Sequence, residues 1–316
     1  SLADWPGTGG AEVFPLLRSS GGEIIVPVDD FNVLAPTHYH RFTDEGDYLG
    51  RVDPLNNMGQ WDNGLRGLVL TDDDRLLFVE SLPATGEFRW VRSDTDGSNV
   101  EHAPMQWTSA HTGVAAAVVG SDGVYVLSHE AADDTRGFAW ADLNDLAAPL
   151  TPIVALPDVA FEQLSVDGGQ VYLIGAEVGD GGAAVLPTVW RLDDEGLIDS
   201  HQPPMAPAGP RWFTHVAMRD GQGLLADNER ALWWFDGGLT AEASILGSVA
   251  AAHESGFWFL HDFDFPAMRL ASDLTPLYSV DPSVESRPVV TLDAGPGVFV
   301  VESKVGNELD LVRYAP

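Results

Sequence analysis

Acidic and histidine side chains recur at one position of a repeated sequence unit, and they are the residues best placed to do chemistry. A short apolar stretch that follows a Gly or Asp turn occurs seven times, and polar residues close each copy. These residues are Asp29 and Asp30; Glu80; His129 and Glu130; Glu177; Asp227, Asn228 and Glu229; His261 and Asp262; and Glu302. Carboxylates bind Ca²⁺, imidazoles bind transition metals, and crowded carboxylates shift each other's pKa values as acid–base catalysis requires.

The elements that position these residues are predicted to be short β-strands. Each copy, such as "DGGQVYLIGAE", follows a weaker apolar stretch and precedes a third stretch with an acidic turn, such as "VWRLDDEGL". The third stretches are spaced roughly 36–51 residues apart, which is typical of four-stranded propeller blades. Val, Ile, Tyr, Phe and Trp dominate the stretches, whereas Gly, Asp, Asn and Pro mark the turns. We therefore predict an all-β, seven-bladed β-propeller of antiparallel blades that occupies residues 1–316 as a single domain.

The last repeat ends with "ELDLVRYAP", a third strand with no fourth strand after it. A propeller must close its ring or leave an exposed sheet edge. Either Leu2–Trp5 or Val13–Leu17 could supply the missing strand, so we expect the N-terminal segment to close the ring.

If the second strands run toward one rim, their ends and the starts of the first strands face the same funnel. The binding site is predicted there, from Glu162, Glu177, Arg211, Trp212, His215, Glu229 and His261. Glu162, His215 and Glu229 are its candidate metal ligands, because the first two are expected at one register of neighbouring blades. A carboxylate beside His215 would raise its pKa, and Arg211 and Trp212 offer an anion clamp and a stacking surface. The alternatives are a structural hydrogen bond between Glu162 and His215, or acids that are simply exposed at strand ends.

Two further stretches could hold a metal ion. "RSDTDGSNVEH" places Asp94, Asp96 and Glu101 around Gly97, as a calcium loop would, but it lacks the flanking helices and the twelfth-position Glu of an EF-hand. A hairpin tip is the preferred interpretation, with a weakly bound surface cation as the alternative. His38 and His40 lie on one face of a strand, which suits a metal pair, although a solvated strand is the preferred interpretation because no third ligand follows.

The stretch "LLFVESLPATGEFRWVRSDTDGSNVEH" also resembles one repeat of the TolB-type, WD40-like bacterial propellers, whose third strand ends in a DGSN-like turn. The resemblance covers this one blade. It implies a propeller fold, an envelope or secreted location, and a role as a protein-binding platform or an accessory domain of a hydrolase. No Gly-x-Ser-x-Gly nucleophile elbow accompanies it.

The composition restricts the partners. The chain has 48 acidic and 16 basic residues, a net charge of −32, no cysteine and 45% hydrophobic residues. This charge disfavours nucleic acid and anionic lipid, and it favours divalent cations, cationic partners or neutral sugars, unless it serves solubility alone. No apolar run reaches the ~20 residues of a membrane span, the start lacks a signal-peptide pattern, and no nucleotide-cofactor fingerprint occurs.

Two functions fit these observations. The first is a non-catalytic, extracytoplasmic binding propeller, monomeric, periplasmic or secreted after loss of a leader, that presents an acidic rim to a protein or glycan. The alternative is a metal-assisted hydrolase, lactonase or polysaccharide lyase that uses the funnel carboxylates and histidines with Ca²⁺ or another divalent metal.

Overall fold

The structure is a computed structural model of the chain. From residue 241 onward, and in several earlier strands, the backbone alone is described. The description covers residues 11–314 except 14–15, 31–37, 54–61, 83–86, 107–112, 120–122, 130–135, 157–158, 168–169, 179–183, 194–195, 204–210, 230, 247, 254–256, 262–266, 272–275, 281–285, 294–297 and 305–308.

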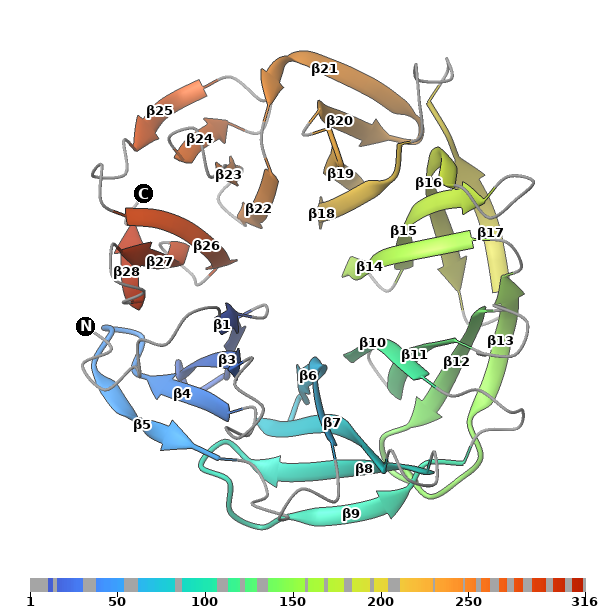
Figure 1. Cartoon of the computed structure of the whole chain (residues 1–316), viewed down its shortest axis with the longest axis vertical. Coiled ribbons are helices and arrows are strands. Elements are labelled where there is room, and N and C mark those ends of the chain that lie inside the picture. Colours follow the sequence, from blue (N-terminus) through green and yellow to red (C-terminus); the bar gives the residue numbers. More distant parts are fainter. Residues whose placement is uncertain are drawn as a thin grey trace. The chain divides into compact units, whose positions relative to one another are not determined.

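All the regular secondary structure among the described residues is β-strand, and the strands form seven sheets (Figure 1). The first sheet contains β1 (Ala11–Val13), β2 (Leu17–Arg18), β3 (Ile24–Asp30), β4 (His38–Phe42) and β5 (Tyr48–Val52). The second contains β6 (Asp62–Leu70), β7 (Arg75–Leu82), β8 (Glu87–Asp94) and β9 (Glu101–Pro104). The third contains β10 (Gly113–Val119), β11 (Gly123–His129), β12 (Arg136–Asp142) and β13 (Thr151–Leu156).

The remaining four sheets follow in chain order. The fourth contains β14 (Val159–Asp167), β15 (Gln170–Val178), β16 (Ala184–Asp193) and β17 (Gly196–His201). The fifth contains β18 (Phe213–Arg219), β19 (Gln222–Asp227), β20 (Ala231–Asp236) and β21 (Leu239–Leu246). The sixth contains β22 (Ser248–His253), β23 (Phe257–His261), β24 (Ala267–Ala271) and β25 (Pro276–Val280), and the seventh contains β26 (Ser286–Asp293), β27 (Val298–Lys304) and β28 (Leu309–Tyr314).

The sheet order confirms the predicted all-β repeat. The strand formed by each apolar copy (β3, β7, β11, β15, β19, β23 or β27) lies between the strands before and after it, and the pairs are antiparallel. The last sheet has three described strands, as its sequence indicated. In the described part of the chain, no helix is long and apolar enough to cross a membrane.

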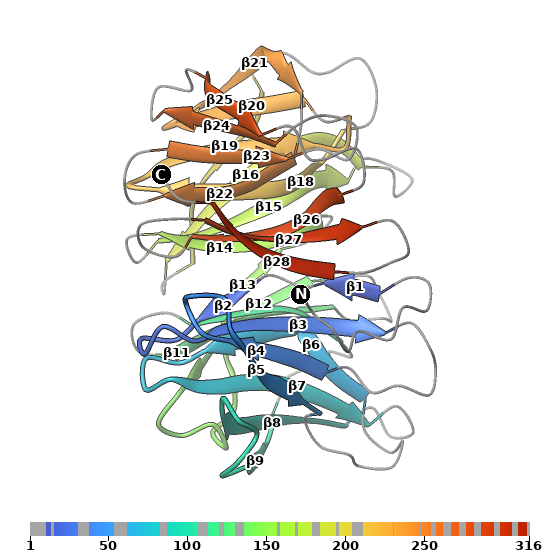
Figure 2. The ribbon, with the colours of Figure 1, turned by 90° about the vertical axis from the view of Figure 1, so that its left-hand side faces the viewer.

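One proposed route of ring closure is wrong. Val13 pairs with Val28, and Leu17 pairs with Ile25, so both ends of the 13–17 segment belong to the first sheet rather than to the last. Figure 2 shows β3 alongside β1 and β4. The short strands β1 and β2 pair with successive parts of β3 and together act as the first strand of their sheet. The other candidate, Leu2–Trp5, lies outside the described residues.

The chain divides into two compact units. The first contains residues 1–124, 141–150 and 282–316, and the second contains residues 125–140 and 151–281. Within the second unit, β18 contacts both β14 and β22, so the first strands of three successive sheets are neighbours. Within the first unit, β6 contacts β10 in the same way, and it contacts β2 and β3 of the first sheet. This stacking of successive sheets through their first strands is the packing of propeller blades.

Each unit has an apolar core between neighbouring sheets. In the first unit, Ile25 and Tyr39 of the first sheet pack against Leu76, Phe78 and Val91 of the second. In the second unit the core lies between the fourth and fifth sheets and contains Tyr172, Ile174, Val189, Phe213, Val216, Leu225, Trp233, Phe235 and Leu239. Alternation along the strands directs these side chains to one face, where their burial stabilises the stack.

Four hairpin tips in the first two sheets have the same five-residue turn, at residues 19–23, 43–47, 71–75 and 94–98. The first N–H donates to the fifth carbonyl, and the fourth N–H donates to the first carbonyl. The fourth residue has a positive φ and is Gly22, Gly46, Asp74 or Gly97. In three tips the hydroxyl of the first residue also accepts a hydrogen bond from the fifth N–H. The Gly- and Asp-containing stretches at these four positions therefore form tight turns.

Candidate functional site

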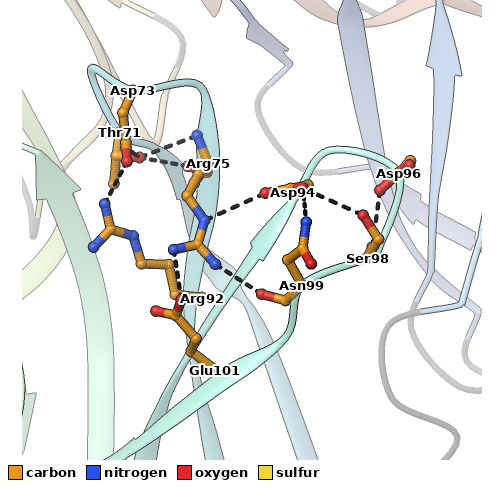
Figure 3. A network of polar contacts seen from close by, with 9 residues as sticks. All are labelled: Thr71, Asp73, Arg75, Arg92, Asp94, Asp96, Ser98, Asn99 and Glu101. Carbon is orange, nitrogen blue, oxygen red and sulfur yellow. Dashed lines mark hydrogen bonds and ion pairs between the residues drawn. The ribbon is translucent and has the colours of Figure 1, made fainter.

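The predicted calcium-like loop is the hairpin tip between β8 and β9, as expected (Figure 3). The Asp94 carboxylate accepts hydrogen bonds from Asn99 Nδ2 at 2.6 Å and Ser98 Oγ at 3.2 Å, and it lies 3.4 Å from Arg75 Nε. Asp96 Oδ1 accepts a hydrogen bond from the Ser98 N–H, and the Ser98 hydrogen bonds lower the pKa of Asp96. These oxygens hold the turn together.

Two arginines connect this tip to the rest of the second sheet. Arg75 donates from Nη2 to the Asn99 carbonyl at 2.7 Å, and its Nη1 lies 3.1 Å from the Glu101 carboxylate. Arg92, one strand away, pairs with Asp73 at 2.6 Å. Figure 3 shows the guanidinium of Arg75 between the tips at residues 71–75 and 94–98, and that of Arg92 beside Thr71 and Asp73. Arg75 fixes the two tips relative to each other, because its guanidinium contacts Asp94, the Asn99 carbonyl and Glu101 at once.

The same tip also packs on the first sheet. Thr95 Oγ1 donates to Glu23 at 3.1 Å, and Glu23 is ion-paired with Arg41. A Cβ placed on Gly97 would lie only 2.7 Å from Cγ1 of Val52, so the backbone of the tip touches this side chain. The loop is therefore an inter-sheet contact of the first unit.

Two other aspartates join neighbouring sheets at their tips. Asp74 accepts a hydrogen bond from the Ser20 N–H at 2.7 Å and another from its hydroxyl. In the second unit, Asp167 accepts a hydrogen bond from the Gly221 N–H at 2.7 Å. Carboxylates at the tips thus take part in holding one sheet to the next, a role that composition alone did not indicate.

The predicted rim residues lie in the fourth to sixth sheets. Glu162 is in β14, Glu177 in β15, His215 in β18 and His261 at the end of β23. Arg211 and Trp212 directly precede β18, and Glu229 follows β19. The side chains of Glu162 and His261 lie outside the described ones. Among the side chains that are described, no group of three His, Asp or Glu residues is arranged to hold a metal ion.

The expected common register of Glu162 and His215 is wrong by one residue. Phe161 pairs with Gly175 and Gln163 with Ile174, which leaves Glu162 as the extra residue of a β-bulge. In β18 the pairing passes from Phe213 to His215, so Thr214 is the extra residue there. Glu162 therefore corresponds to Thr214, because both strands carry a bulge that apolar patterning does not reveal.

By the same register, Gly175 corresponds to Asp227, because their partners Phe161 and Phe213 immediately precede the two bulges. Counting two residues onward aligns Glu177 with Glu229. Glu177 is partly buried and Glu229 is exposed. These two glutamates therefore occupy equivalent positions at one end of neighbouring sheets.

Arg211 is engaged in an ion pair with Asp227, at the end of β19. Arg211 Nη1 donates to Asp227 Oδ2 at 2.8 Å, and Trp233 Nε1 donates to the same oxygen at 3.1 Å. Asp227 Oδ1 accepts hydrogen bonds from the N–H groups of Glu229 and Ala231, each at 2.9 Å. The Asp227 side chain is fully buried. The expected anion clamp is thus occupied by a carboxylate of the protein.

His215 is exposed, and its Nδ1 lies 3.0 Å from Thr214 Oγ1. Its pKa is lowered by partial loss of hydration, which is the opposite of the shift expected from a neighbouring carboxylate. A neutral imidazole is therefore favoured at neutral pH. Trp212 is partly buried, and its backbone exchanges two hydrogen bonds with Asn228, at 3.0 and 3.2 Å.

A second buried acid lies near the end of β7. The Glu80 side chain is fully buried and accepts a hydrogen bond from Arg89 Nε at 2.6 Å. Burial raises the pKa of Glu80, and the hydrogen bond and charge of Arg89 oppose that shift. The ends of the second strands are therefore not uniformly exposed, since Glu80 and Asp227 are both buried ion-pair partners. Glu80 lies directly opposite Arg89 in the β7–β8 pairing, which brings the two charged groups together.

The expectation that His38 and His40 lie on a solvated strand is also wrong. Their exposures are 1% and 2%, and their Nε2 atoms are 3.2 Å apart. His40 Nδ1 lies 3.1 Å from the hydroxyl of Tyr48. The alternation of polar and apolar residues along β4 did not reveal this burial, because both faces of a central strand can be covered by other parts of the protein.

A shallow hollow of about 240 Å³ lies beside the outer edge of the second sheet. Arg92, Glu101 and His102 line one side of it, and residues 143–147 line the other. Gln106 Nε2 donates to the Ala147 carbonyl at 2.9 Å and holds this loop in place. The hollow is smaller than the roughly 300–1,000 Å³ that small-molecule sites typically occupy.

Comparison with known proteins supports the fold. No family model matches the sequence, and no curated protein is significantly similar to it. Among solved structures, the β-propeller domain of the Trilobed protease from Pyrococcus furiosus has a TM-score of 0.62 at 8% identity. That match covers 96% of this chain and 95% of that domain, which has an open velcro topology.

Two prolyl peptidases are similar over part of their length. A prolyl endopeptidase gives a TM-score of 0.65 at 11% identity, over 97% of this chain and 47% of that one. Prolyl oligopeptidase B from Galerina marginata gives 0.66 at 9% identity, over 96% and 49%. The chain thus spans about half the length of these peptidases. Together with the stacked antiparallel sheets, these similarities show that the chain has a β-propeller fold.

Proposed function

We propose that this protein is a non-catalytic, extracytoplasmic binding propeller whose acidic rim takes a cationic protein surface as its partner. The location rests on the resemblance of one repeat to the TolB-type propellers. The seven sheets are proposed to be the seven blades of one monomeric ring. Because Val13 and Leu17 belong to the first sheet, Leu2–Trp5 remains the candidate closing strand.

The observation that carries this proposal is the pairing of the arginines. Every arginine whose side chain is described has a nitrogen within 4.0 Å of an Asp or Glu oxygen: Arg18, Arg41, Arg51, Arg75, Arg89, Arg92, Arg191, Arg211 and Arg219. The chain has 48 acidic residues against 16 basic ones. The described arginines are thus paired with carboxylates of the protein itself. The excess carboxylates give the surface a negative potential that attracts positively charged partners.

The rim also has the character of a binding surface. Asp227 and Arg211 satisfy each other, so among the described side chains Glu177 and Glu229 are the acidic groups that can contact a partner at this end of the fourth and fifth sheets. Partly exposed charges steer association and select partners more than they add affinity. A cationic protein patch that docks here would therefore bind quickly and with a strong dependence on salt.

Charge removal at the rim, and separately at the opposite end of the fifth sheet, tests the proposal. Glu177→Gln with Glu229→Gln removes two charges from the rim, and Asp220→Asn with Asp236→Asn removes two from the opposite tips. Binding of a nona-arginine peptide is measured by titration calorimetry at low and at physiological salt. We expect the rim pair to weaken binding about 10-fold and the tip pair less than about 2-fold. Equal losses from the two pairs would refute a rim site.

The metal-assisted enzyme is the second candidate, because the similar structures include protease and peptidase chains. Glu162, His215 and Glu229 would be its metal ligands, with Ca²⁺ or another divalent ion. Elemental analysis after dialysis tests it: a stoichiometric metal that is lost in both Glu162→Gln and His215→Asn favours the enzyme. A metal-free protein that still binds the cationic peptide favours the binding propeller.

A further inference from the structure

The first sheet contains a buried histidine pair that the proposed function does not use. His38 and His40 project from the same face of β4, and their rings meet edge to face with centroids 5.0 Å apart. The Nε2 atoms are 3.2 Å apart, which is a hydrogen-bonding distance. A neutral imidazole has one N–H donor and one acceptor nitrogen, so one proton between the two Nε2 atoms satisfies this contact.

The pair is connected to the edge strand β5 through Tyr48. The hydroxyl of Tyr48 lies 3.1 Å from His40 Nδ1, and its ring packs against both His40 and Phe42. Tyr48 is 39% exposed, so this side chain reaches from the buried imidazole to solvent. Among the described strands, β5 is an outermost strand of its sheet and pairs with β4 alone. The His40–Tyr48 contact therefore helps to fasten an edge strand.

The charges around His40 oppose its protonation. Arg51 of β5 lies directly opposite His40 in the strand register, and like charges at such a pair destabilise a sheet. Burial, followed by His38 and Arg51, lowers the pKa of His40 to about 3, while Asp53 acts in the other direction. Asp53 is itself held by Arg51 at 2.6 Å. A proton on His40 would thus place a buried positive charge across the ladder from a guanidinium.

We propose that His38 and His40 form an acid-sensitive latch, which holds β5 on the first sheet while both rings are neutral and releases that edge strand when His40 is protonated. Release hydrates the imidazolium, separates it from Arg51 and frees the backbone donors and acceptors of β4 for another strand. The latch is independent of the rim site in the fourth and fifth sheets, so either can fail without the other.

The direction and size of the effect follow from proton linkage. The latched form binds a proton at about pH 3, whereas a released histidine binds one near its ordinary value of 6.5. The released form therefore holds more protons between these values, and the latch is fully present above about pH 6.5 and weakens as the pH falls. Between about pH 7.5 and pH 5 the opening equilibrium of β5 should rise about 30-fold.

Native-state hydrogen exchange of the full-length protein tests the latch. Protection factors, corrected for the intrinsic pH dependence of exchange, are compared for β5 and for β21, an edge strand without histidine in it or in its partner β20. We expect the protection of β5 to fall about 30-fold from about pH 7.5 to pH 5 while that of β21 changes less than about 3-fold. A parallel loss in both strands, or no loss in β5, would overturn the proposal.

Two variants and one spectroscopic measurement complete the test. His40→Gln keeps a polar side chain that does not titrate in this range, and it should reduce the fall in β5 protection to less than about 3-fold. Tyr48→Phe retains both histidines and should keep the full fall. If His40→Gln does not fold, an NMR titration of the imidazoles in the wild-type protein decides. The latch requires that His40 stays neutral at about pH 5, and an ordinary titration of His40 near 6.5 would reject it.

Discussion

The carboxylate of Asp227 is fully buried, yet it lies 2.8 Å from Arg211, a residue outside any strand. The strand pairing of Phe213 with Asp227 brings the two side chains together. Removing the charge would leave Arg211 without its partner, and an asparagine would turn an N–H donor toward donors on Glu229, Ala231 or Trp233.

We therefore expect Asp227→Asn to reduce the free energy of unfolding by about 3–5 kcal/mol, as breaking a buried ion pair does. Urea denaturation monitored by tryptophan fluorescence measures it. The matched control is Asp199→Asn, which breaks the more exposed Arg191–Asp199 pair and should cost less than about 1 kcal/mol. Equal effects would show that burial does not distinguish these pairs.

Gly97→Ala should be more harmful than the same change at another left-handed glycine. Gly97 has a φ of +79° and a near contact with Val52, whereas Gly46 has a φ of +94° with nothing within 4 Å of an added Cβ. Alanine should cost about 1 kcal/mol at Gly46 and about 2–4 kcal/mol at Gly97. In a double-mutant cycle, Val52→Ala should relieve part of the Gly97→Ala effect, and strictly additive values would contradict the contact.

Arg89→Met should destabilise the protein more at high pH than at low pH. It leaves Glu80 buried without its cation, so the pKa of Glu80 rises further above its unfolded value. The folded state then binds the extra proton, and its stability falls as the pH rises through that pKa. We expect a loss of about 3–5 kcal/mol near pH 8 that shrinks toward pH 5. Arg92→Met, whose partner Asp73 is largely exposed, should cost less than about 1 kcal/mol at either pH.

Calcium should not stabilise the tip at residues 94–98. The Asp94 carboxylate already accepts hydrogen bonds from Ser98 and Asn99, and Arg75 lies beside it. Thermal unfolding in about 5 mM CaCl₂, against NaCl of the same ionic strength, should shift Tm by less than about 1 °C. A larger rise that disappears in Asp94→Asn would establish a cation site there.

The strands could be predicted from the sequence because each is a short apolar run bounded by Gly or Asp. Residues 171–176 and 298–301 are apolar runs within such stretches, and turn residues beside the stretches leave few alternatives. The hairpin tip at Gly97 was predictable for the same reason, since Gly supplies its positive φ.

Register and burial could not be predicted from one chain. The bulges at Glu162 and Thr214 carry no compositional mark, and each changes which side chains lie opposite each other. The Arg211–Asp227 pair joins residues 16 positions apart through strand pairing, which local pattern does not reveal. The burial of His38 and His40 depends on what covers the far face of β4, so polarity alone pointed the wrong way.

The bulges in β14 and β18 have a consequence for how such a chain can change over generations. Beyond the extra residue, the alternation of side chains between the two sides of the strand is offset by one position. Deleting Glu162 or Thr214 would restore simple alternation and leave every other residue opposite its present partner. Deleting a paired residue of the same strand would instead turn one half of the strand over and exchange apolar for polar groups. Replacing either residue disturbs no ladder partner. These strands should therefore tolerate replacement or loss of the bulge residue and reject changes of length at their paired positions.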